Sequence, residues 1–317
     1  MAISALKVAD YYWPINGMRR RFIPVGGENL TTTQQTSLRS LRIIEKLPID
    51  YSDDFFGHYP RLKLGVTESV DYYGAQLSRL AEDIITQSLP GPTDWVMTGP
   101  AYNVLPGAPN LLCSYIYEDL KNKLPDSITL SLVHLRVETD DLEIKDSESL
   151  NKYHNYSTFT QQERNQLYKE SREPLIEPRD FRGRSILFVN DIKVTGTQQR
   201  YMQQGFAKVD PPQICWLYIL AIDREIAEAE PEIEYAINQS SLASFEEFAD
   251  LLATHNLEYT SRCITRLLSY ELSKLAKLFQ ILDVGRKQTI LELATAEGRF
   301  SGDYFKEKID LLKRCVG

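Results

Sequence analysis

Residues 186–197 read Ile-Leu-Phe-Val-Asn-Asp-Ile-Lys-Val-Thr-Gly-Thr and lead directly into a helical pattern over residues 198–204. The pattern predicts an apolar strand over residues 185–190 that ends in a polar pair, Asn190 and Asp191, followed by a tight turn. In open α/β sheets, ligands bind outside the carboxyl ends of the strands. The free N–H groups at the start of the next helix form a site for an anion. The stretch therefore predicts a phosphate-binding turn at the edge of a sheet.

The turn itself contains residues suited to this task. Gly196 lets the backbone approach a ligand closely, and Thr195 and Thr197 add hydroxyl donors. Each charge-assisted hydrogen bond to a phosphate contributes about 1.5–3 kcal/mol. Asp191 would repel a phosphate, so it fits sugar hydroxyls, a metal ion or developing positive charge. The alternative interpretation is a purely structural strand–turn–helix in which Asp191 and Thr195 cap the helix.

The sequence around this stretch alternates between apolar runs and helical patterns. Helices are expected over residues 67–87 and 110–123, and further strands over residues 94–98, 128–137 and 214–222. Strands separated by helices imply right-handed crossovers and a mainly parallel sheet. The predicted fold class is therefore α/β.

After Pro231 the sequence is almost purely helical. Ser244 and Glu247 form a capping box that starts one of these helices. An apolar seam with alternating four- and three-residue spacing follows, made of Leu268, Leu272, Leu275, Phe279 and Leu282. It covers about two heptads, fewer than a true coiled coil needs. Two interpretations remain, packing within the chain or a surface for an oligomer or a partner protein.

The predicted organisation has three parts. Residues 1–60 are expected to be an irregular N-terminal extension, residues 61–232 an α/β domain, and residues 233–317 a helical C-terminal module. The chain of 317 residues contains 36 Lys+Arg and 44 Asp+Glu, which gives a formal net charge of −8. This acidic balance argues against an extended nucleic-acid contact.

Composition and motifs exclude several other classes of protein. No run of eighteen apolar residues is present, so no membrane span is expected. The four cysteines are widely spaced and form no metal-binding pair, which favours a reduced, cytoplasmic protein. The sequence has no Walker loop and no GxGxxG, HExxH or GxSxG motif.

The strand, the acid and the Thr-Gly-Thr turn resemble the motif with which type I phosphoribosyltransferases bind phosphoribosyl pyrophosphate (PRPP). In that family two acids contact the ribose hydroxyls, and the following loop holds the 5′-phosphate. Asp191 matches the second acid, and residues 195–197 match the loop. Three positions depart from the family pattern. Asn190 replaces the first acid, Val194 stands where purine-salvage members carry a catalytic Asp, and Gln198 stands where many members have Thr.

Two other segments add to the resemblance, which covers residues 60–225. The loop at residues 98–103, with Tyr102 and Asn103, looks like the place where the family binds pyrophosphate. Residues 160–165 are similar to the flexible loop of competence-type (ComF-like) members, in which an Arg often follows a capped turn. Arg164 is the corresponding residue here, and Thr160 and Glu163 are expected to form the capping box.

The resemblance implies a role for each of these residues. Asp191 and Asn190 would be catalytic ribose contacts, with Asp191 also the metal contact for Mg²⁺ bound with PRPP. Pyrophosphate would bind at Tyr102, Asn103 and Arg164. The 5′-phosphate would bind at the loop and its neighbours, namely Lys193, Val194, Thr195, Gly196, Thr197 and Gln198.

Three functional hypotheses follow from the resemblance. The protein is an enzyme that transfers a ribosyl group from PRPP, or a sensor that binds a nucleotide without turnover because one motif acid is missing. The third hypothesis is an effector whose helical module docks a protein partner. The helical tail resembles the divergent phosphoribosyltransferase-like proteins of bacterial conflict systems, which implies antiviral defence and a toxin effector.

Overall fold

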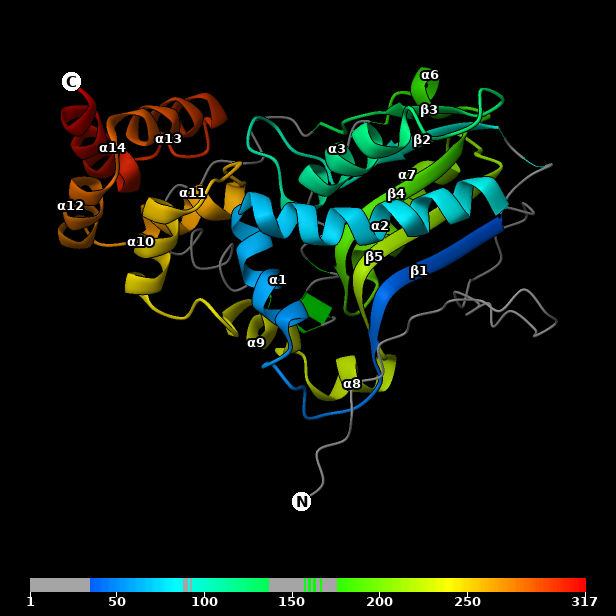
Figure 1. The fold of residues 1–317 in the computed structure, drawn as a ribbon, viewed down its shortest axis with the longest axis horizontal. Helices are drawn as coiled ribbons and strands as arrows, with labels where there is room; N and C mark the ends of the chain where they lie inside the picture. The colour runs from blue at the N-terminus through cyan, green and yellow to red at the C-terminus, as the bar shows by residue number, and fades with distance from the viewer. Residues whose placement is uncertain are drawn as a thin grey trace.

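The computed structural model describes residues 35–87, 91, 93–136, 157, 159–160, 162–163, 166 and 176–317. Within this part of the chain five strands form one sheet in the order β1-β5-β4-β2-β3, and every neighbouring pair is parallel (Figure 1). The strands are β1 (Gln35–Ile44), β2 (Asp94–Thr98), β3 (Thr129–Leu132), β4 (Ser185–Lys193) and β5 (Gln213–Ile222). The predicted α/β class with a mainly parallel sheet is confirmed.

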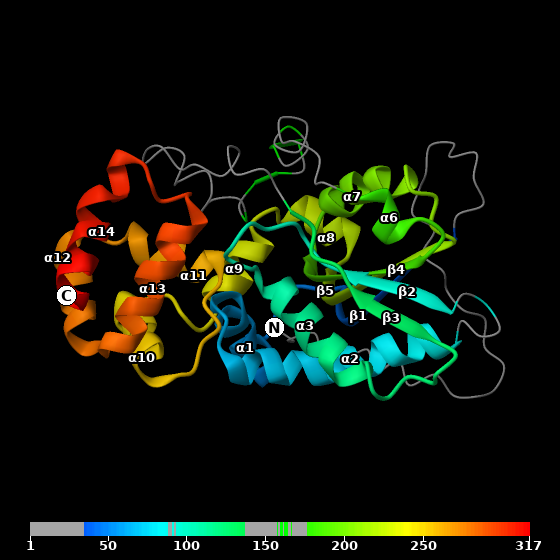
Figure 2. The same cartoon turned by 90° about the horizontal axis from the view of Figure 1, so that it is seen from above.

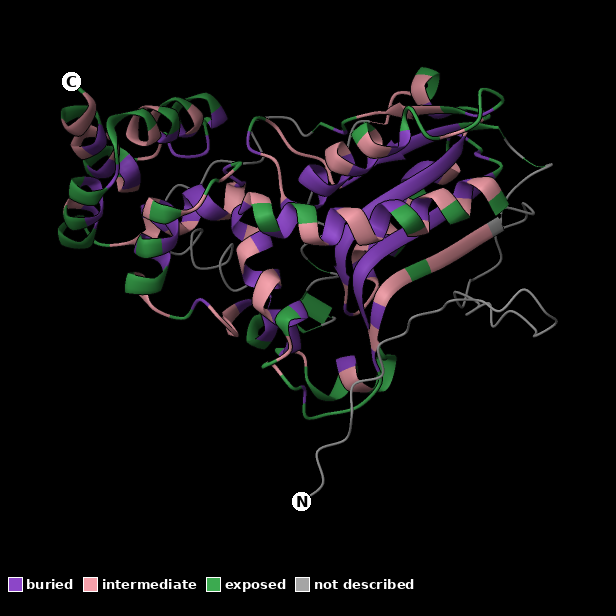
Figure 3. Cartoon of the chain, viewed as in Figure 1, coloured by how far each residue is buried: buried purple, intermediate pink, exposed green. Residues whose placement is uncertain are grey.

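Helices cover both faces of the sheet, which explains why β4 and β5 are apolar along most of their length. One face carries α1 (Asp54–Leu64), α2 (Thr67–Gln87) and α3 (Ala108–Leu120), and the other carries α6 (Pro178–Phe181) and α7 (Thr197–Ala207) (Figure 2). Successive strand residues point to opposite faces. Leu187 and Val189 therefore pack with α1–α3, whereas Ile186 and Phe188 pack with α7. Both central strands are buried (Figure 3).

The first sixty residues are not irregular throughout, which corrects the prediction for that segment. Gln35–Ile44 form the edge strand β1, and α1 begins at Asp54. β1 pairs along its length with β5, from Gln35 opposite Gln213 to Ile44 opposite Ile222. The local sequence of β1 lacks the apolar run of a central strand because an edge strand is only partly buried. Pairing with a strand that is 178 positions away decides its conformation.

Strand lengths differ from the prediction where the neighbouring strand sets them. β3 covers residues 129–132 instead of 128–137, because its partner β2 ends at Thr98 and offers no ladder beyond Leu132. β4 continues past Asn190 to Lys193, because β5 runs beside it as far as Ala221. The observed bounds of α2 and β2 agree with those predicted.

The C-terminal part is helical, as predicted. After α8 (Arg224–Ala229) and α9 (Ile233–Gln239) come α10 (Phe245–Thr254), α11 (Ser261–Ser269), α12 (Leu272–Ile281), α13 (Val284–Glu297) and α14 (Asp303–Val316). The capping box of Ser244 and Glu247 is present at the start of α10. Among the described helices, none has the apolar stretch that crossing a bilayer requires.

The apolar seam is split between two helices, because α11 ends at Ser269 and α12 begins at Leu272. Leu272 is 38% exposed. The other four seam residues are buried in one core with α10, α13 and α14: Leu268, Leu275, Phe279 and Leu282. This burial supports packing within the chain for those four residues.

The helical module packs directly on the junction between α1 and α2. Leu64 and Val66 from that junction, together with Leu105 after β2, belong to the hydrophobic core of the module. The backbone N–H of Glu258 donates to the carbonyl of Gly65 at 2.9 Å. Figure 1 shows α11 beside the end of α1. The module therefore helps to position the carboxyl-terminal end of α1.

Gly65→Ala is expected to lower the free energy of unfolding by at least about 2 kcal/mol, because a left-handed residue alone costs roughly 1–2 kcal/mol. Gly65 has φ +89°, and a Cβ built there would lie 1.8 Å from the carbonyl oxygen of Glu258. Gly57, inside α1, has no atom from outside its own helical turn within 4 Å of its added Cβ. Gly57→Ala should therefore raise stability by about 0.5–1 kcal/mol. Urea unfolding measures both changes, and equal effects would contradict the prediction.

Candidate functional site

The carboxyl ends of β2 and β4 meet at the point where the chain direction across the sheet reverses. β2 and β4 are neighbours, but the chain leaves β2 towards β3 on one side and β4 towards β5 on the other. Such a switch point is where open α/β sheets bind ligands. The loop of residues 99–107 after β2 and the turn of residues 194–196 after β4 both begin there. The fold thus brings the two predicted stretches to the same end of the sheet.

The turn after β4 has the geometry that the sequence predicts. Gly196 has φ +70° and stands immediately before α7, a conformation that glycine adopts without strain. The hydroxyls of Thr195 and Thr197 are hydrogen-bonded at 3.0 Å. Gln198 lies in the first turn of α7. Val194 packs its side chain into the hydrophobic core, so only its backbone is available to a ligand.

Arg200 is a site residue that the sequence analysis missed. Its Nη1 donates to the carbonyl of Thr195 and its Nη2 to the hydroxyl of Thr197, each at 3.0 Å. A Cβ built on Gly196 would lie 3.3 Å from Cε of Lys193 and 3.5 Å from Nη1 of Arg200. Two cations therefore flank the turn. The spacing in the sequence could have identified Arg200. Residues four apart on a helix share a face, and Arg200 is four residues after Gly196.

The side chains that flank the turn are cationic, and their surroundings disfavour the charge. Burial, followed by the charge of Arg200, lowers the pKa of Lys193, and the charge of Asp223 offsets part of this shift. Burial and then the charge of Arg224 lower the pKa of Arg200. The first turn of α7 contains no acid, and a cation near a helix N-terminus is unfavourable. A phosphate group at the turn would relieve each of these costs.

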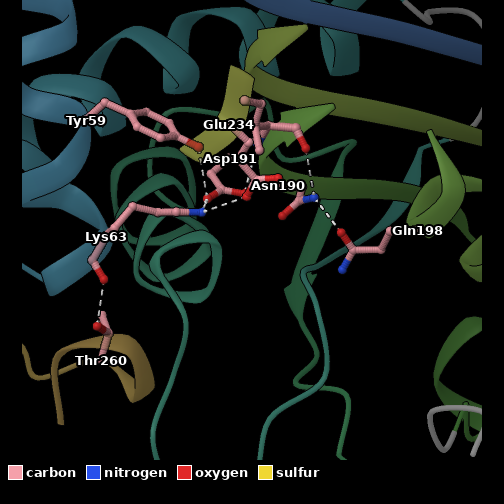
Figure 4. Close-up of polar contacts among 8 residues, drawn as sticks. Tyr59, Lys63, Asn190, Asp191, Gln198, Glu234 and Thr260 are labelled. Atoms are coloured by element: carbon pink, nitrogen blue, oxygen red, sulfur yellow. Dashed lines mark hydrogen bonds and ion pairs between the residues drawn. The ribbon is translucent and has the colours of Figure 1, made fainter. Parts of the chain in front are cut away.

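Asn190 and Asp191 point to opposite faces of β4, so the structure does not hold them as a side-by-side pair. The Nδ2 of Asn190 donates to Oε1 of Gln198 at 2.9 Å, on the side of α7 (Figure 4). Asp191 faces α1, where its Oδ2 accepts from Nζ of Lys63 and from the hydroxyl of Tyr59 at 3.3 Å. The two amides therefore lie on the side of α7, and the carboxylate belongs to a buried ion pair on the side of α1.

The loop after β2 is held by the helical module. Oε2 of Glu297, in the last turn of α13, accepts from the backbone N–H groups of Val104 at 3.0 Å and Leu105 at 2.8 Å. The Nδ2 of Asn103 donates to the carbonyl of Glu297 at 3.3 Å. Tyr102 packs edge-to-face on His134, with ring centroids 5.5 Å apart. The predicted pyrophosphate loop is thus fixed by a buried carboxylate that sequence reasoning did not identify.

A comparison with known protein families matches residues 41–312 to the family described as PRTase ComF-like. The chain belongs to the ComF-like phosphoribosyltransferase family. The match runs from β1 into α14, so the region shared with this family extends beyond residues 60–225, where the motifs lie, and includes most of the helical module. A search among curated proteins found no match.

Phosphoribosyltransferases of this type are expected to use Mg²⁺, but the arrangement around Asp191 does not fit a direct metal contact. The ammonium of Lys63 lies against Oδ2, and Oδ1 accepts the backbone N–H of Ile192 at 2.8 Å. Within the described ranges, no group of three His, Cys, Asp or Glu side chains is placed to hold a metal ion. The donor set at this motif is therefore one carboxylate whose two oxygens already accept from an ammonium and from a backbone N–H.

Arg164, the remaining residue predicted for the site, lies outside the described residues. The expected capping box before it is present. The carboxylate of Glu163 accepts from the backbone N–H of Thr160 at 2.7 Å and from its hydroxyl at 2.8 Å. The assignment of Arg164 to pyrophosphate stays a prediction.

Proposed function

We propose that this ComF-like phosphoribosyltransferase binds PRPP, or a related phosphoribosyl ligand, with the 5′-phosphate at the turn after β4. The observation that carries the proposal is the concentration of positive charge there. Lys193 and Arg200 flank Gly196, their pKa values are lowered, and the N-terminus of α7 points at the same place. Backbone N–H groups of α7 and the hydroxyls of Thr195 and Thr197 complete a set of donors for a phosphate.

The neighbouring side chains suit the rest of a phosphoribosyl ligand. The amides of Asn190 and Gln198 offer donors and acceptors to ribose hydroxyls, and the loop that contains Tyr102 and Asn103 lies after the adjacent strand. Ribosyl transfer breaks the bond between the anomeric carbon and a pyrophosphate oxygen and forms a bond from that carbon to an acceptor. Its oxocarbenium-like state needs positioning and charge compensation more than a strong base. We propose this transfer as the activity of the site.

Arg200→Gln is expected to weaken PRPP binding at least tenfold, or about 1.4 kcal/mol, in calorimetric titration. The substitution removes a charge-assisted donor beside the phosphate but leaves the turn in place. The variant loses two hydrogen bonds to the turn but also the repulsion of Arg200 by Arg224 and by the helix end, so the thermal stability of the free protein should change little. Loss of binding together with stable folding identifies a ligand contact.

Arg179→Gln is the matched control. Arg179 is in α6, before the amino end of β4, and its side chain is 82% exposed. This variant should bind PRPP like the wild type. The proposal fails if PRPP produces neither heat nor thermal stabilisation in the wild type, or if both variants bind equally well.

The ion pair of Asp191 favours a second candidate function, binding of a phosphoribosyl ligand without turnover. Asp191 is 5% exposed and both its oxygens have partners within the protein, while Asn190 supplies no negative charge. Release of pyrophosphate from PRPP in the presence of candidate acceptors distinguishes the two functions. An enzyme releases it, whereas a sensor binds PRPP and leaves it intact. The role as a defence effector with a protein partner stays a prediction.

A further inference from the structure

Lys63 forms a buried ion pair with the one acid of the motif. It lies in the last turn of α1, its side chain is 13% exposed, and that of Asp191 is 7% exposed. A buried pair of this kind persists only when further hydrogen bonds satisfy the charged groups. Asp191 has these bonds, since Oδ1 accepts from Ile192 and Oδ2 accepts from Tyr59. The ammonium of Lys63 is therefore an integral component of the hydrogen-bonded arrangement around Asp191.

A second carboxylate faces the same ammonium. Oε1 of Glu234, in α9, lies 3.9 Å from Nζ of Lys63, and its side chain is 6% exposed (Figure 4). The ammonium thus lies between two buried carboxylates, one from β4 and one from α9. Burying two carboxylates without a cation would be expensive. Lys63 stands between the two acids, where other proteins place a divalent cation, and supplies one positive charge there.

Hydrogen bonds from the helical module hold the backbone of Lys63 in place. The hydroxyl of Thr260, the residue before α11, donates to the carbonyl of Lys63 at 2.7 Å. Gly65 ends α1 and accepts the N–H of Glu258 at 2.9 Å. The module therefore holds the backbone from which the side chain of Lys63 extends to Asp191, which makes the ammonium a fixed charge.

We propose that Lys63 is a positioning residue that acts as the built-in counter-cation of Asp191, so that a phosphoribosyl ligand binds without a divalent metal at this carboxylate. The proposal rests on the proposed function for the identity of the ligand. It departs from the expectation of magnesium at Asp191, because the ammonium of Lys63 already lies against Oδ2 and the backbone N–H of Ile192 donates to Oδ1.

The first test uses the wild-type protein and ribose 5-phosphate, which carries no pyrophosphate to bind a metal by itself. Calorimetric titrations in Mg²⁺ and in EDTA should give dissociation constants that agree within about twofold, since a tenfold change corresponds to about 1.4 kcal/mol. A loss of tenfold or more in EDTA would overturn the proposal while leaving the proposed function intact.

The second test removes the ammonium and one carboxylate together, so that the net charge does not change. Lys63→Met/Glu234→Gln leaves Asp191 buried without a cation. In EDTA this variant should bind ribose 5-phosphate at least tenfold more weakly than the wild type, and Mg²⁺ should restore the affinity. Lys121→Met/Glu118→Gln makes the same exchange at an exposed pair at the C-terminal end of α3 and should change nothing.

A third measurement needs no sugar phosphate. Mn²⁺ alone should raise the thermal midpoint of Lys63→Met/Glu234→Gln, because a cation that binds the folded state stabilises it, and it should leave the wild type unchanged. Lys63→Arg, which keeps the charge, should also be unresponsive. Stabilisation of the wild type by Mn²⁺, or none in the paired variant, would overturn the role of Lys63. Failure of ribose 5-phosphate to bind the wild type would instead count against the proposed function.

Discussion

Glu297→Ala is expected to lower the free energy of unfolding by about 3–5 kcal/mol, the range for removing one partner of a buried ion pair. Glu297 is 1% exposed and its Oε1 lies 3.0 Å from Nη2 of Arg299. The other oxygen accepts from the backbone N–H groups of Val104 and Leu105. Truncation removes all of these acceptor contacts at once, and each N–H that loses its acceptor in a buried place costs about 1–3 kcal/mol.

Guanidinium unfolding measures this loss, and Glu292→Gln provides the control. Glu292 lies in the same helix on the exposed side and accepts a hydrogen bond from Gln288 at 2.6 Å. Its replacement should change the unfolding free energy by no more than about 0.5 kcal/mol. If both variants were equally stable, the carboxylate of Glu297 would not hold the loop after β2.

Lys63→Met is expected to cost about 3–5 kcal/mol of unfolding free energy, because it leaves Asp191 and Glu234 buried without their ammonium. Asp191→Asn should cost less. In that variant Glu234, 3.9 Å from Nζ in the wild type, still faces the ammonium of Lys63 and compensates part of its charge. The two partners of one ion pair should therefore have unequal effects.

Urea unfolding of the two variants measures this asymmetry. Lys123→Met is the matched control, because Lys123 pairs with Asp119 on the surface and its side chain is 53% exposed. Exposed pairs contribute about 0–1 kcal/mol. Equal losses for Lys63→Met and Asp191→Asn would mean that Glu234 does not share the ammonium.

Much of the fold could be predicted because it depends on local patterns. The helical periodicity from Val70 to Ile84 predicts α2, and the apolar runs predict β2 and β5. The turn with Gly196 could also be predicted, because a glycine with positive φ before a helix is a local requirement. The ends of β3 and β4 could not, since each strand continues only as far as its neighbour.

The amino-acid sequence by itself determined the parallel α/β sheet, the glycine turn before α7 and the helical character of the C-terminal region. Only the tertiary structure decided which partners Asn190 and Asp191 have. Lys63, for example, contacts Asp191 although the two are 128 positions apart in the chain. The tertiary structure also placed Glu297 against Leu105 across 192 positions. The physical reason is that backbone periodicity and turn chemistry act within a few residues. The partner of a buried charge is instead set by the packing of elements that are distant in the chain.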